Sequence, residues 1–360
     1  MGVSGAATSP PATAASSRAD FAADLRQRVD AYAAAYGGEL RGGAGYLLKS
    51  ALLLTAFAVC GGLVLFGGFG GWATLGLALA WGAASALVAF NVPHDALHGA
   101  ASTRPWVNRV LSWSFDLIGM HATTWWIKHN LAHHGYTNQE GLDPDVDAWP
   151  LLRFAPGQRR LWFHRVQLLY APLVYASLSL FMVFALDVKV LGSREFCATY
   201  GVDVGWRQRL ACAASKALYL GYALALPLYL LPFSPLAIVG GFVLVHAVIG
   251  LASAAVLLPA HLVEGAVFPT PEEARADPWG TQLAATWDFA PESRVANFLL
   301  GGFNTNAFHH LFPRVCHLHY RALTRILRET AAEHGLPYHA LSLPGAVRAH
   351  ARFLLAMGRA

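Results

Sequence analysis

Two long stretches of the chain contain no charged residue, and together they predict four membrane-spanning helices. Neither 50–93 nor 217–263 contains Asp, Glu, Lys or Arg. Because a spanning helix needs about 20 predominantly apolar residues, each stretch is long enough for two. Glycines within 67–71 divide the first stretch, prolines at 232 and 235 divide the second, and both residue types favour turns. The pattern therefore predicts two helical hairpins, with spans at about 50–67, 72–93, 211–231 and 236–260.

A third apolar stretch, at about 166–186, is also long enough to cross a membrane. A single extra crossing would put the two halves of the chain on opposite sides of the bilayer. If the histidine groups described below share one site, the number of crossings between them must be even. We therefore expect this stretch to form a helix that lies in the membrane interface.

The remaining, more polar segments predict a domain outside the bilayer. The Arg- and Glu-rich stretch at about 321–333 is expected to form one of its helices. Residues 1–19 are small and polar, which predicts a disordered tail, and 356–360 are expected to form a short C-terminal tail. The predicted fold is an all-α integral membrane domain at 20–355, with four transmembrane helices in two hairpins, an interfacial helix and a cytosolic helical cap.

The composition agrees with a membrane protein. Hydrophobic residues make up 55% of the 360 residues and charged residues only 13%, which is too little charge for an ordinary soluble surface. The formal net charge is +5, and basic residues such as Lys128, Arg159 and Arg160 lie beyond the open ends of the hairpins. By the positive-inside rule, both turns lie outside, while the cap and both termini lie in the cytoplasm, as in a bacterial inner membrane. This crowding of basic residues indicates membrane orientation and no nucleic-acid partner.

The sixteen histidines are placed in groups with a helical spacing. His94 and His98 directly follow the second predicted span, and a separation of four puts both rings on one helical face. The same spacing recurs at His129 and His133, and a further group ends the chain segment NTNAFHH. His261 ends the fourth predicted span, so it returns to the membrane face of the first groups. The predicted metal ligands are His94, His98, His129, His133, His134, His261, His309 and His310.

Eight histidines exceed the needs of one metal ion but supply two ions with four ligands each, so a dinuclear centre is the economical interpretation. Imidazole binds iron, zinc, copper or nickel, so the ligand type alone does not name the metal. Asn306 precedes the last histidine pair by three and four residues and is a further ligand, directly or through water. The four cysteines are widely scattered and contain no C-x-x-C pair, which gives no sign of a zinc knuckle or a disulfide framework.

Residues near these groups are expected to orient the rings or to hold water, because neutral histidines leave the positive charge of the metals uncompensated. They are Asp95, Asp143, Asp145, Asp147, Glu264, His164 and His317.

The other histidines are interpreted as structural. His246 lies inside a predicted span, where a hydrogen-bonded contact between helices is the expected role. His317 and His319 alternate as turn neighbours would, so ligation is not the favoured role for either. The residues without a ligand-spaced partner are expected at the surface or at helix ends: His121, His334, His339 and His350.

The three histidine motifs HDALH, HNLAHH and NAFHH stand in a fixed order around the two predicted hairpins. In this the chain resembles the membrane fatty-acid desaturases, particularly the bacterial acyl-lipid and linoleoyl-CoA desaturase branch. The segments HHGYTNQEGLDPDVD, HLVEG and HHLFPRVCHLHY extend the likeness, which covers roughly residues 20–355.

The resemblance implies a four-span fold with a cytosolic cap and a histidine-ligated centre of two irons. It also implies O2-dependent insertion of a double bond into an acyl chain carried by a lipid, coenzyme A or acyl carrier protein. The chain has no haem-binding HPGG segment and no cysteine cluster, so a separate donor such as a ferredoxin or a cytochrome b5-like protein is expected. Trp125, Trp126 and Phe308 are expected to line a substrate channel that opens to the membrane lipids.

The chain departs from this branch at three positions. Its third motif begins with Asn306 in place of the usual Gln and has Phe308 in place of an acidic residue, and Leu168 replaces a histidine. These changes are expected near the substrate or the surroundings of the metals. A hydroxylase, ketolase or acetylenase on the same scaffold is therefore the alternative. A histidine-rich metal transporter, zinc receptor or zinc hydrolase is a more distant one, because the spans are nearly free of ionisable residues.

Overall fold

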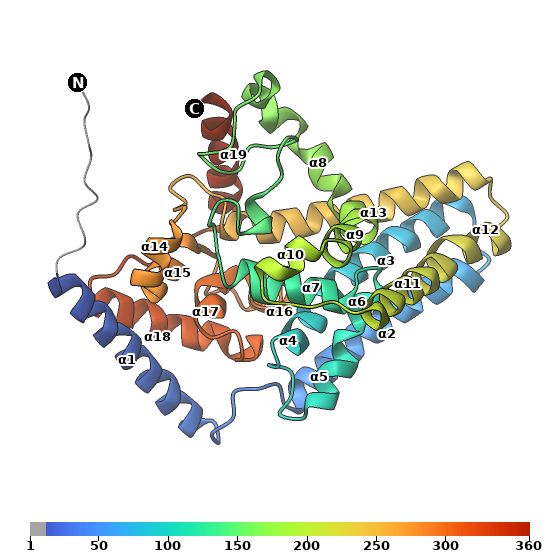
Figure 1. The fold of residues 1–360 in the computed structure, drawn as a ribbon. Coiled ribbons are helices and arrows are strands. Elements are labelled where there is room, and N and C mark those ends of the chain that lie inside the picture. Colours follow the sequence, from blue (N-terminus) through green and yellow to red (C-terminus); the bar gives the residue numbers. More distant parts are fainter. Residues whose placement is uncertain (1–11) are drawn as a thin grey trace.

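The computed structural model describes residues 12–360 and the side chains from Asp20 onward, and most of this part is helical (Figure 1). The α-helices are α1 (Ala12–Ala35), α2 (Ala44–Phe66), α3 (Gly71–Asn91), α4 (Pro93–Leu97), α5 (Pro105–Ser112), α6 (Ser114–Leu117), α7 (Ala122–Trp125), α8 (Gln167–Phe181), α9 (Asp187–Gly192), α10 (Arg194–Thr199), α11 (Trp206–Leu220), α12 (Leu226–Leu230), α13 (Pro235–Leu257), α14 (Pro271–Ala276), α15 (Pro278–Ala285), α16 (Arg294–Leu299), α17 (Asn306–Leu311), α18 (Tyr320–Glu333) and α19 (Leu343–Arg359).

Shorter elements connect these helices. The π-helical segments are η1 (Trp126–His133), η4 (Met182–Leu186) and η5 (Gly221–Ala225). The 3₁₀ turns are η2 (Pro144–Val146), η3 (Trp162–Val166), η6 (Leu258–Ala260), η7 (Phe303–Thr305) and η8 (His317–His319). Two short strands, β1 (Asp288–Phe289) and β2 (Ala340–Leu341), pair in parallel.

Both predicted hairpins are present. The first consists of α2 and α3, and the second consists of α11, η5 and α12 followed by α13. These helices extend side by side toward one end of the molecule, where both turns lie (Figure 1). The first helix begins at Ala44, six residues before the predicted span. The charged Lys49 lay outside the prediction, but the helix includes it, because its side chain is buried against the cap and donates to the carbonyl of Phe298.

The third apolar stretch forms one continuous helix, α8–η4–α9, which is longer than predicted. Five helices in the described residues are long and apolar enough to cross a membrane, and this one is among them. Figure 1 shows α8 crossing α13, whereas α3 runs alongside α13. The two helices approach closely where they cross: an ideal Cβ at Gly250 of α13 would lie only 2.4 Å from the carbonyl oxygen of Tyr175 in α8.

The cap lies at the end of the hairpins opposite their turns (Figure 1). Its apolar core forms between α1 and α18, where Phe21, Leu25, Leu323 and Leu327 are fully buried. The predicted helix at 321–333 is confirmed as α18, whose apolar face gives it the pattern of an amphipathic surface helix. This core also includes Phe308, so it holds the helix that carries the last histidine pair.

Two predicted chain ends differ from the structure. The alanine-rich segment that begins at Ala12 is already helical, since alanine has the highest helix propensity, so α1 includes 12–19. Residues 1–11 of the predicted N-terminal tail lie outside the described residues. At the other end, α19 continues to Arg359 and is not a free tail, because an ideal Cβ at Gly358 would lie 2.3 Å from the His164 carbonyl and Arg153 donates to the Met357 carbonyl at 2.7 Å.

Candidate metal centre

The first histidine pair lies in a short helix directly after α3. Pro93 occupies the first turn of α4, where its missing N–H costs nothing. His94 and His98 lie one helical turn apart, as predicted. Gly99 then adopts a φ of +71°, a conformation that glycine tolerates, and the chain turns away after His98. Both rings are buried.

The second histidine group lies on a π-helix, where the sequence predicted an α-helix. The backbone N–H of His134 donates to the carbonyl of His129 at 3.0 Å, a bond that spans five residues. This wider turn places residues four and five positions apart on the same side. His129, His133 and His134 therefore converge, whereas an α-helix would turn the third ring away from the first.

The last group approaches the first through two glycines. Gly301 and Gly302 both have positive φ, and an ideal Cβ at Gly301 would lie only 2.0 Å from the carbonyl oxygen of Phe90. Any side chain at this position would therefore separate the segment from the end of α3. The close approach brings α17, with His309 and His310, beside the first two groups.

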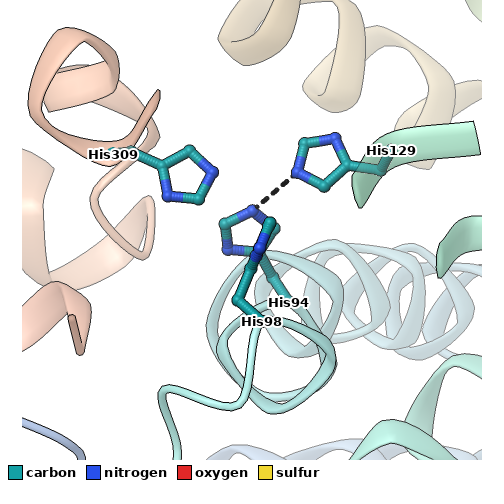
Figure 2. A group of neighbouring side chains, drawn as sticks. All are labelled: His94, His98, His129 and His309. Atoms are coloured by element: carbon teal, nitrogen blue, oxygen red, sulfur yellow. Dashed lines mark hydrogen bonds between the residues drawn. The ribbon is translucent and has the colours of Figure 1, made fainter. Parts of the chain in front are cut away.

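Four rings from these segments form one group. Figure 2 shows His94, His98, His129 and His309 with their rings facing a common centre. Their potential ligand atoms all lie within 4.8 Å of one another, and all four residues are buried. His94 Nε2 lies 3.0 Å from His129 Nε2.

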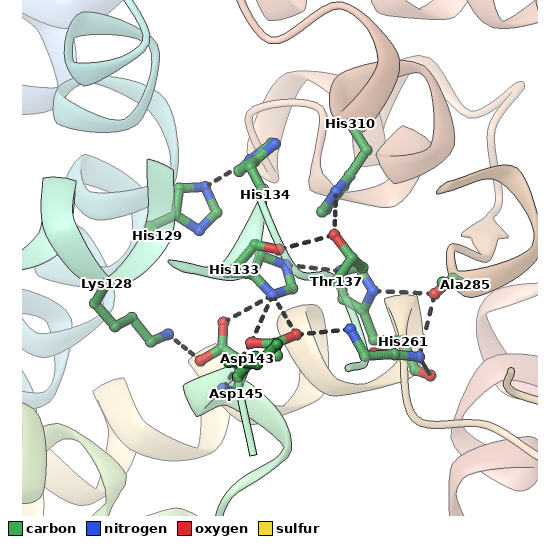
Figure 3. Close-up of polar contacts among 12 residues, drawn as sticks. Lys128, His129, His133, His134, Thr137, Asp143, Asp145, His261, Ala285 and His310 are labelled. Carbon is green, nitrogen blue, oxygen red and sulfur yellow. Dashed lines mark hydrogen bonds and ion pairs between the residues drawn. The ribbon is translucent and has the colours of Figure 1, made fainter. Parts of the chain in front are cut away.

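Three rings form a second group beside it (Figure 3). His133, His261 and His310 are buried, and their potential ligand atoms also lie within 4.8 Å of one another. His133 Nε2 lies 3.2 Å from His261 Nε2, and the amide of Asn306 lies 2.6 Å from the same His261 nitrogen. His134 connects the groups, because its Nε2 lies 3.3 Å from His129 Nε2 while its ring stacks on that of His310 at 4.2 Å.

Hydrogen-bond partners on the outer side fix the orientation of the three rings His133, His261 and His310. His133 Nδ1 faces the Asp143 carboxylate at 3.0 Å, and His261 Nδ1 faces the Ala285 carbonyl at 3.2 Å. His310 Nδ1 faces the hydroxyl of Thr137, which donates its own hydrogen to the His133 carbonyl. All three partners accept hydrogen bonds, so each Nδ1 carries a proton. In the neutral rings the Nε2 lone pairs then face one another.

Asn306 Nδ2 can donate to His261 Nε2, and a metal ion would satisfy the facing lone pairs together. Two nitrogens that bind one ion at about 2.1 Å and at a right angle lie about 3.0 Å apart, close to the observed separations. The Nε2 atoms of His98, His309 and His310 have no hydrogen-bond partner within the described part of the chain. The residues therefore fit a histidine-ligated metal site.

Burial keeps most of these rings neutral. Burial, together with the neighbouring imidazoles, holds the pKa values of the following rings well below their ordinary value: His98, His129, His134, His309 and His310. Burial beside His133 lowers the pKa of His261 to about 3. For His133 burial also disfavours the charge, but Asp143 and Asp145 outweigh it and raise the pKa. Neutral imidazole is the form that binds a metal.

Besides Asp143, two more of the predicted outer carboxylates contact the centre. Asp95 Oδ2 accepts hydrogen bonds from the backbone N–H of His317 at 3.1 Å and from its ring at 2.8 Å, while Asp95 Oδ1 lies 3.5 Å from His94 Nδ1. The other His317 nitrogen lies 2.8 Å from the ammonium group of Lys49. Beside the other ring group, the Asp145 carboxylate lies 3.4 Å from His133 Nδ1 and pairs with the buried Lys128.

Other predicted outer residues lie elsewhere. The carboxylate of Glu264 is exposed and pairs with Arg352 at 3.4 Å, because the chain turns outward after the buried Leu262 and Val263. His164 is fully buried, but its ring bonds to the Leu161 N–H and the Pro150 carbonyl beside the C-terminal helix. The Asp147 carboxylate pairs with Lys189 at the surface at 3.5 Å.

The remaining histidines divide into confirmed and corrected predictions. His246 is a helix contact, as predicted, since Ser179 and Tyr219 hydrogen-bond its two nitrogens at 2.9 and 2.8 Å. His121 and His350 are buried, where exposed or helix-end positions were expected. His121 nevertheless lies at a helix end, as expected, directly before α7 and beside Asp116. His350 lies within α19 and bonds to Tyr175 and to the Leu262 carbonyl.

Several residues that hold the last histidine pair, His309 and His310, were not predicted. Tyr320 places its hydroxyl 2.8 Å from His309 Nδ1. Asp288 accepts the backbone N–H of Ala307 at 2.9 Å, in the first turn of α17, and receives the Tyr338 hydroxyl at 2.6 Å. Burial raises the pKa of Asp288 to about 7. An acidic residue between apolar neighbours was the available signal for Asp288, but its partners lie far away in the sequence.

A cavity of about 360 Å³ opens beside the second group. His129, His133, His261 and Asn306 form its polar end. Its wall is largely apolar and includes Trp125, Leu152, Leu178, Met182 and Leu186.

Two of the three predicted channel residues do not line this cavity. Trp126 is partly exposed on the outer side of η1. Phe308 is fully buried against Phe312 and Tyr320 in the cap core, since it points away from the two histidines that follow it. Of the sequence departures, Asn306 therefore lies at the centre and Phe308 does not.

Comparison with known proteins agrees with these features. The family model described as "Fatty acid desaturase" matches residues 70–342, a range that contains every histidine of both groups. The sn-1 linoleoyl-lipid 6-desaturase of Arthrospira platensis is 32% identical over 320 residues, which cover 88% of this chain and 87% of that protein. A protein of the same name from Synechocystis sp. is 32% identical over 342 residues, covering 93% and 95%. The acyl-lipid (8-3)-desaturase of Physcomitrium patens is 29% identical over 344 residues, covering 94% and 72%.

Proposed function

Because the chain belongs to the fatty acid desaturase family, and is thus an oxidoreductase acting on fatty acyl chains, we propose that its two histidine groups hold two iron ions. The observation that carries this proposal is the close approach of ring nitrogens from distant segments, 3.2 Å between His133 Nε2 and His261 Nε2 and 3.0 Å between His94 Nε2 and His129 Nε2. The proposed ligands of the first ion are His94, His98, His129 and His309. Those of the second would be His133, His261 and His310, while His134 contacts a ring of each group and Asn306 lies next to His261.

Two irons would supply an O2-dependent oxidation of an unactivated methylene, which has no acidic proton for a side chain to remove. The protein's part is to hold the acyl chain and the ligands in place. Asp143, Thr137 and the Ala285 carbonyl hold the proton on Nδ1 of their histidines, so that each Nε2 keeps its lone pair for the metal. The apolar cavity wall excludes water from the reacting methylene.

We place the acyl substrate in the cavity beside His133. The cavity wall is largely hydrocarbon, which suits an acyl chain. One wall belongs to α8, whose Leu169 and Leu173 are more than 70% exposed and are suited to contact lipid. The acyl chain of the substrate can therefore enter the cavity from the bilayer.

The carrier is proposed to be a membrane lipid. The relatives named above are acyl-lipid desaturases, and the cavity supports the same class. Recognition of coenzyme A would require free cations for its phosphates, but the two lysines at the cavity, Lys128 and Lys189, are paired with Asp145 and Asp147.

The contact between His133 and His261 also supports four spans and an interfacial α8. Between these two residues the chain passes through α8–α9, α11–α12 and α13. If all three crossed the bilayer, the two histidines would lie on opposite sides. Two crossings return the chain to the starting side, so α8–α9 is proposed to lie in the interface, in line with its crossing of α13. The positive-inside rule then puts the metal centre and both termini in the cytoplasm, at the inner membrane of a bacterium.

Electrons are proposed to come from a separate donor such as a ferredoxin or a cytochrome b5-like protein. The described residues hold four cysteines, of which three are buried and all are free, and they form no cluster for an iron–sulfur centre. The exposed Arg159, Arg160 and Arg165 offer a basic surface at the cap for an acidic donor.

The experiment that tests the function is expression of the full chain in a host of known lipid composition. Iron is quantified per purified chain, and new unsaturated acyl species are located by mass spectrometry. About two irons and a new double bond support the proposal. A hydroxylated, oxo or acetylenic product would instead support the alternative chemistry on the same scaffold, for which Asn306 at the centre is the relevant departure. One zinc and unchanged lipids would contradict the proposal.

A further inference from the structure

A second cavity lies among the spanning helices, away from the histidines. Its volume is about 580 Å³, and its lining comes from α2, α3 and the second hairpin. On α3 the lining extends from Gly71 to Ser85, and on α13 from Ala237 to Ile249. It shares no lining residue with the cavity beside His133. Ser85, the lining residue of α3 closest to the metal centre, precedes His94 by nine residues, or about 13 Å of helix.

The length of this second cavity suits one acyl chain. Fourteen residues separate Gly71 from Ser85, so the cavity follows α3 for about 21 Å. One leaflet of the hydrocarbon core is about 15 Å thick, half of the bilayer value. The cavity therefore extends inward from the hairpin turns and reaches past the middle of the bilayer.

The lining offers almost nothing to a polar ligand, because its hydroxyl groups are already engaged. Thr74 donates to the Phe69 carbonyl and Ser85 to the Trp81 carbonyl, at 3.0 and 2.8 Å. Tyr219 hydrogen-bonds to His246, and Tyr222 donates to the Leu117 carbonyl. The Trp81 indole N–H has no partner within the described residues, but it lies against α2, 3.2 Å from an ideal Cβ at Gly61. The occupant must therefore present hydrocarbon.

Two glycines on the cavity wall, Gly240 and Gly241, are not used for helix packing. In membranes, small residues normally allow two helices to approach closely. Gly82 and Gly250 have that role, since an ideal Cβ at either would contact a neighbouring helix at 3.2 or 2.4 Å. At Gly240 and Gly241, by contrast, a Cβ would meet no atom within 4 Å. Between the hairpins these two glycines leave space for something other than protein.

The end of the cavity near the turns has the character of a membrane interface. Trp72 lines the cavity there and is 88% exposed, and Tyr229 of the neighbouring α12 is 85% exposed. Tryptophan and tyrosine favour the level of the lipid headgroups. We infer that this cavity binds one acyl chain of a phospholipid from the leaflet on the side of the hairpin turns, with the headgroup near Trp72 and the chain running between α3 and α13 toward Trp81. This lipid is not the substrate, and the inference does not depend on the proposed chemistry.

Photo-crosslinking of the full chain tests this site. The protein is reconstituted in vesicles of phosphatidylethanolamine and phosphatidylglycerol that contain a phosphatidylethanolamine with a diazirine in one acyl chain. After irradiation, adducts are mapped by peptide mass spectrometry. Trp81 is only 9% exposed, so we expect it to be labelled through the cavity. Leu236, which is 82% exposed and does not line the cavity, reports general contact with the bilayer.

The decisive variant is Gly241→Phe, which fills the cavity from α13. We expect labelling of Trp81 to fall at least fivefold while labelling of Leu236 is unchanged. Gly76→Phe is the matched control, because Gly76 is exposed on α3, has the same open surroundings and does not line the cavity. If Gly241→Phe fails to fold, Gly240→Leu replaces it. Absence of Trp81 adducts in the unmodified chain, or equal Trp81 labelling in the filled variant and the control, would overturn the inference.

Discussion

Asp143 Oδ2 lies 3.0 Å from His133 Nδ1, the ring nitrogen opposite the one that faces His261. The same carboxylate accepts the backbone N–H groups of Asn138 and Asp145 at 2.8 and 2.9 Å, so its position is fixed. Removing its charge should free the His133 ring to rotate and lower its basicity. Loss of such an outer partner typically costs about 10- to 100-fold in metal affinity or activity. We expect this loss for Asp143→Asn, measured as iron retained per chain against a chelator series and as turnover.

Asp147→Asn is the control for that substitution, since the Asp147 carboxylate pairs with Lys189 at the surface. Equal iron retention in both variants would show that Asp143 does not support the metal.

Removing a ring from the second group should abolish turnover. His310 is buried, and its Nε2 has no partner in the described chain, so His310→Ala deletes a proposed ligand without breaking a hydrogen bond of that atom. We expect iron per chain to fall and no unsaturated product, while the protein still enters the membrane fraction. His334→Ala is the matched control, because His334 bonds to Asp24 in the cap, 3.0 Å away. Turnover that persists in the His310 variant would refute its assignment as a ligand.

Asp288 should make stability depend on pH. Its pKa is raised to about 7 in the folded protein, compared with about 3.9 when unfolded. The folded state therefore binds the proton more tightly, which stabilises it. This contribution to the free energy of unfolding is fully present below pH 3.9 and is lost as the pH rises through 7. We expect the melting temperature of the native chain, compared with that of Asp288→Asn, to decline from pH 5 to pH 8. A constant difference between the two proteins across this range would contradict the prediction.

Reversing the exposed charges at Arg159 and Arg160 should weaken the interaction with an acidic electron donor. Electrostatic steering raises association rates by about 10- to 1,000-fold and is screened by salt. We expect donor-dependent turnover of Arg159→Glu/Arg160→Glu to fall about tenfold at low ionic strength and to approach that of the native chain at high salt. Arg275→Glu, on the exposed α14, is the control. Unchanged turnover and salt dependence in the double variant would exclude this surface as the docking site.

Much of the fold and the centre could be predicted because the signals are local. Uncharged stretches set the hairpins, and four-residue spacings identified the histidine pairs. The structure brings all eight predicted histidines together, and Asn306 with them. These predictions needed only helix geometry and the thickness of a bilayer.

The rest depends on contacts between distant segments. A carboxylate such as Glu264 can lie three residues after a ligand and still point outward, because the turn after His261 decides its direction. Asp288 and Tyr338 are fifty residues apart and meet only through the β1–β2 pairing. The helix at 166–186 was correctly found, but its length and its crossing of α13 depend on the packing surface that α13 offers.

The π-helix of the second histidine motif has a consequence for how this chain tolerates change. Its hydrogen bonds span five residues, so η1 holds one residue more in its turn than an α-helix would. Deleting a single residue between His129 and His133 would allow an ordinary α-helix to form, which locally is the more favourable backbone. The three imidazoles would then lie three and four residues apart and would still share one helical face. This segment can therefore lose its extra residue without separating the three rings.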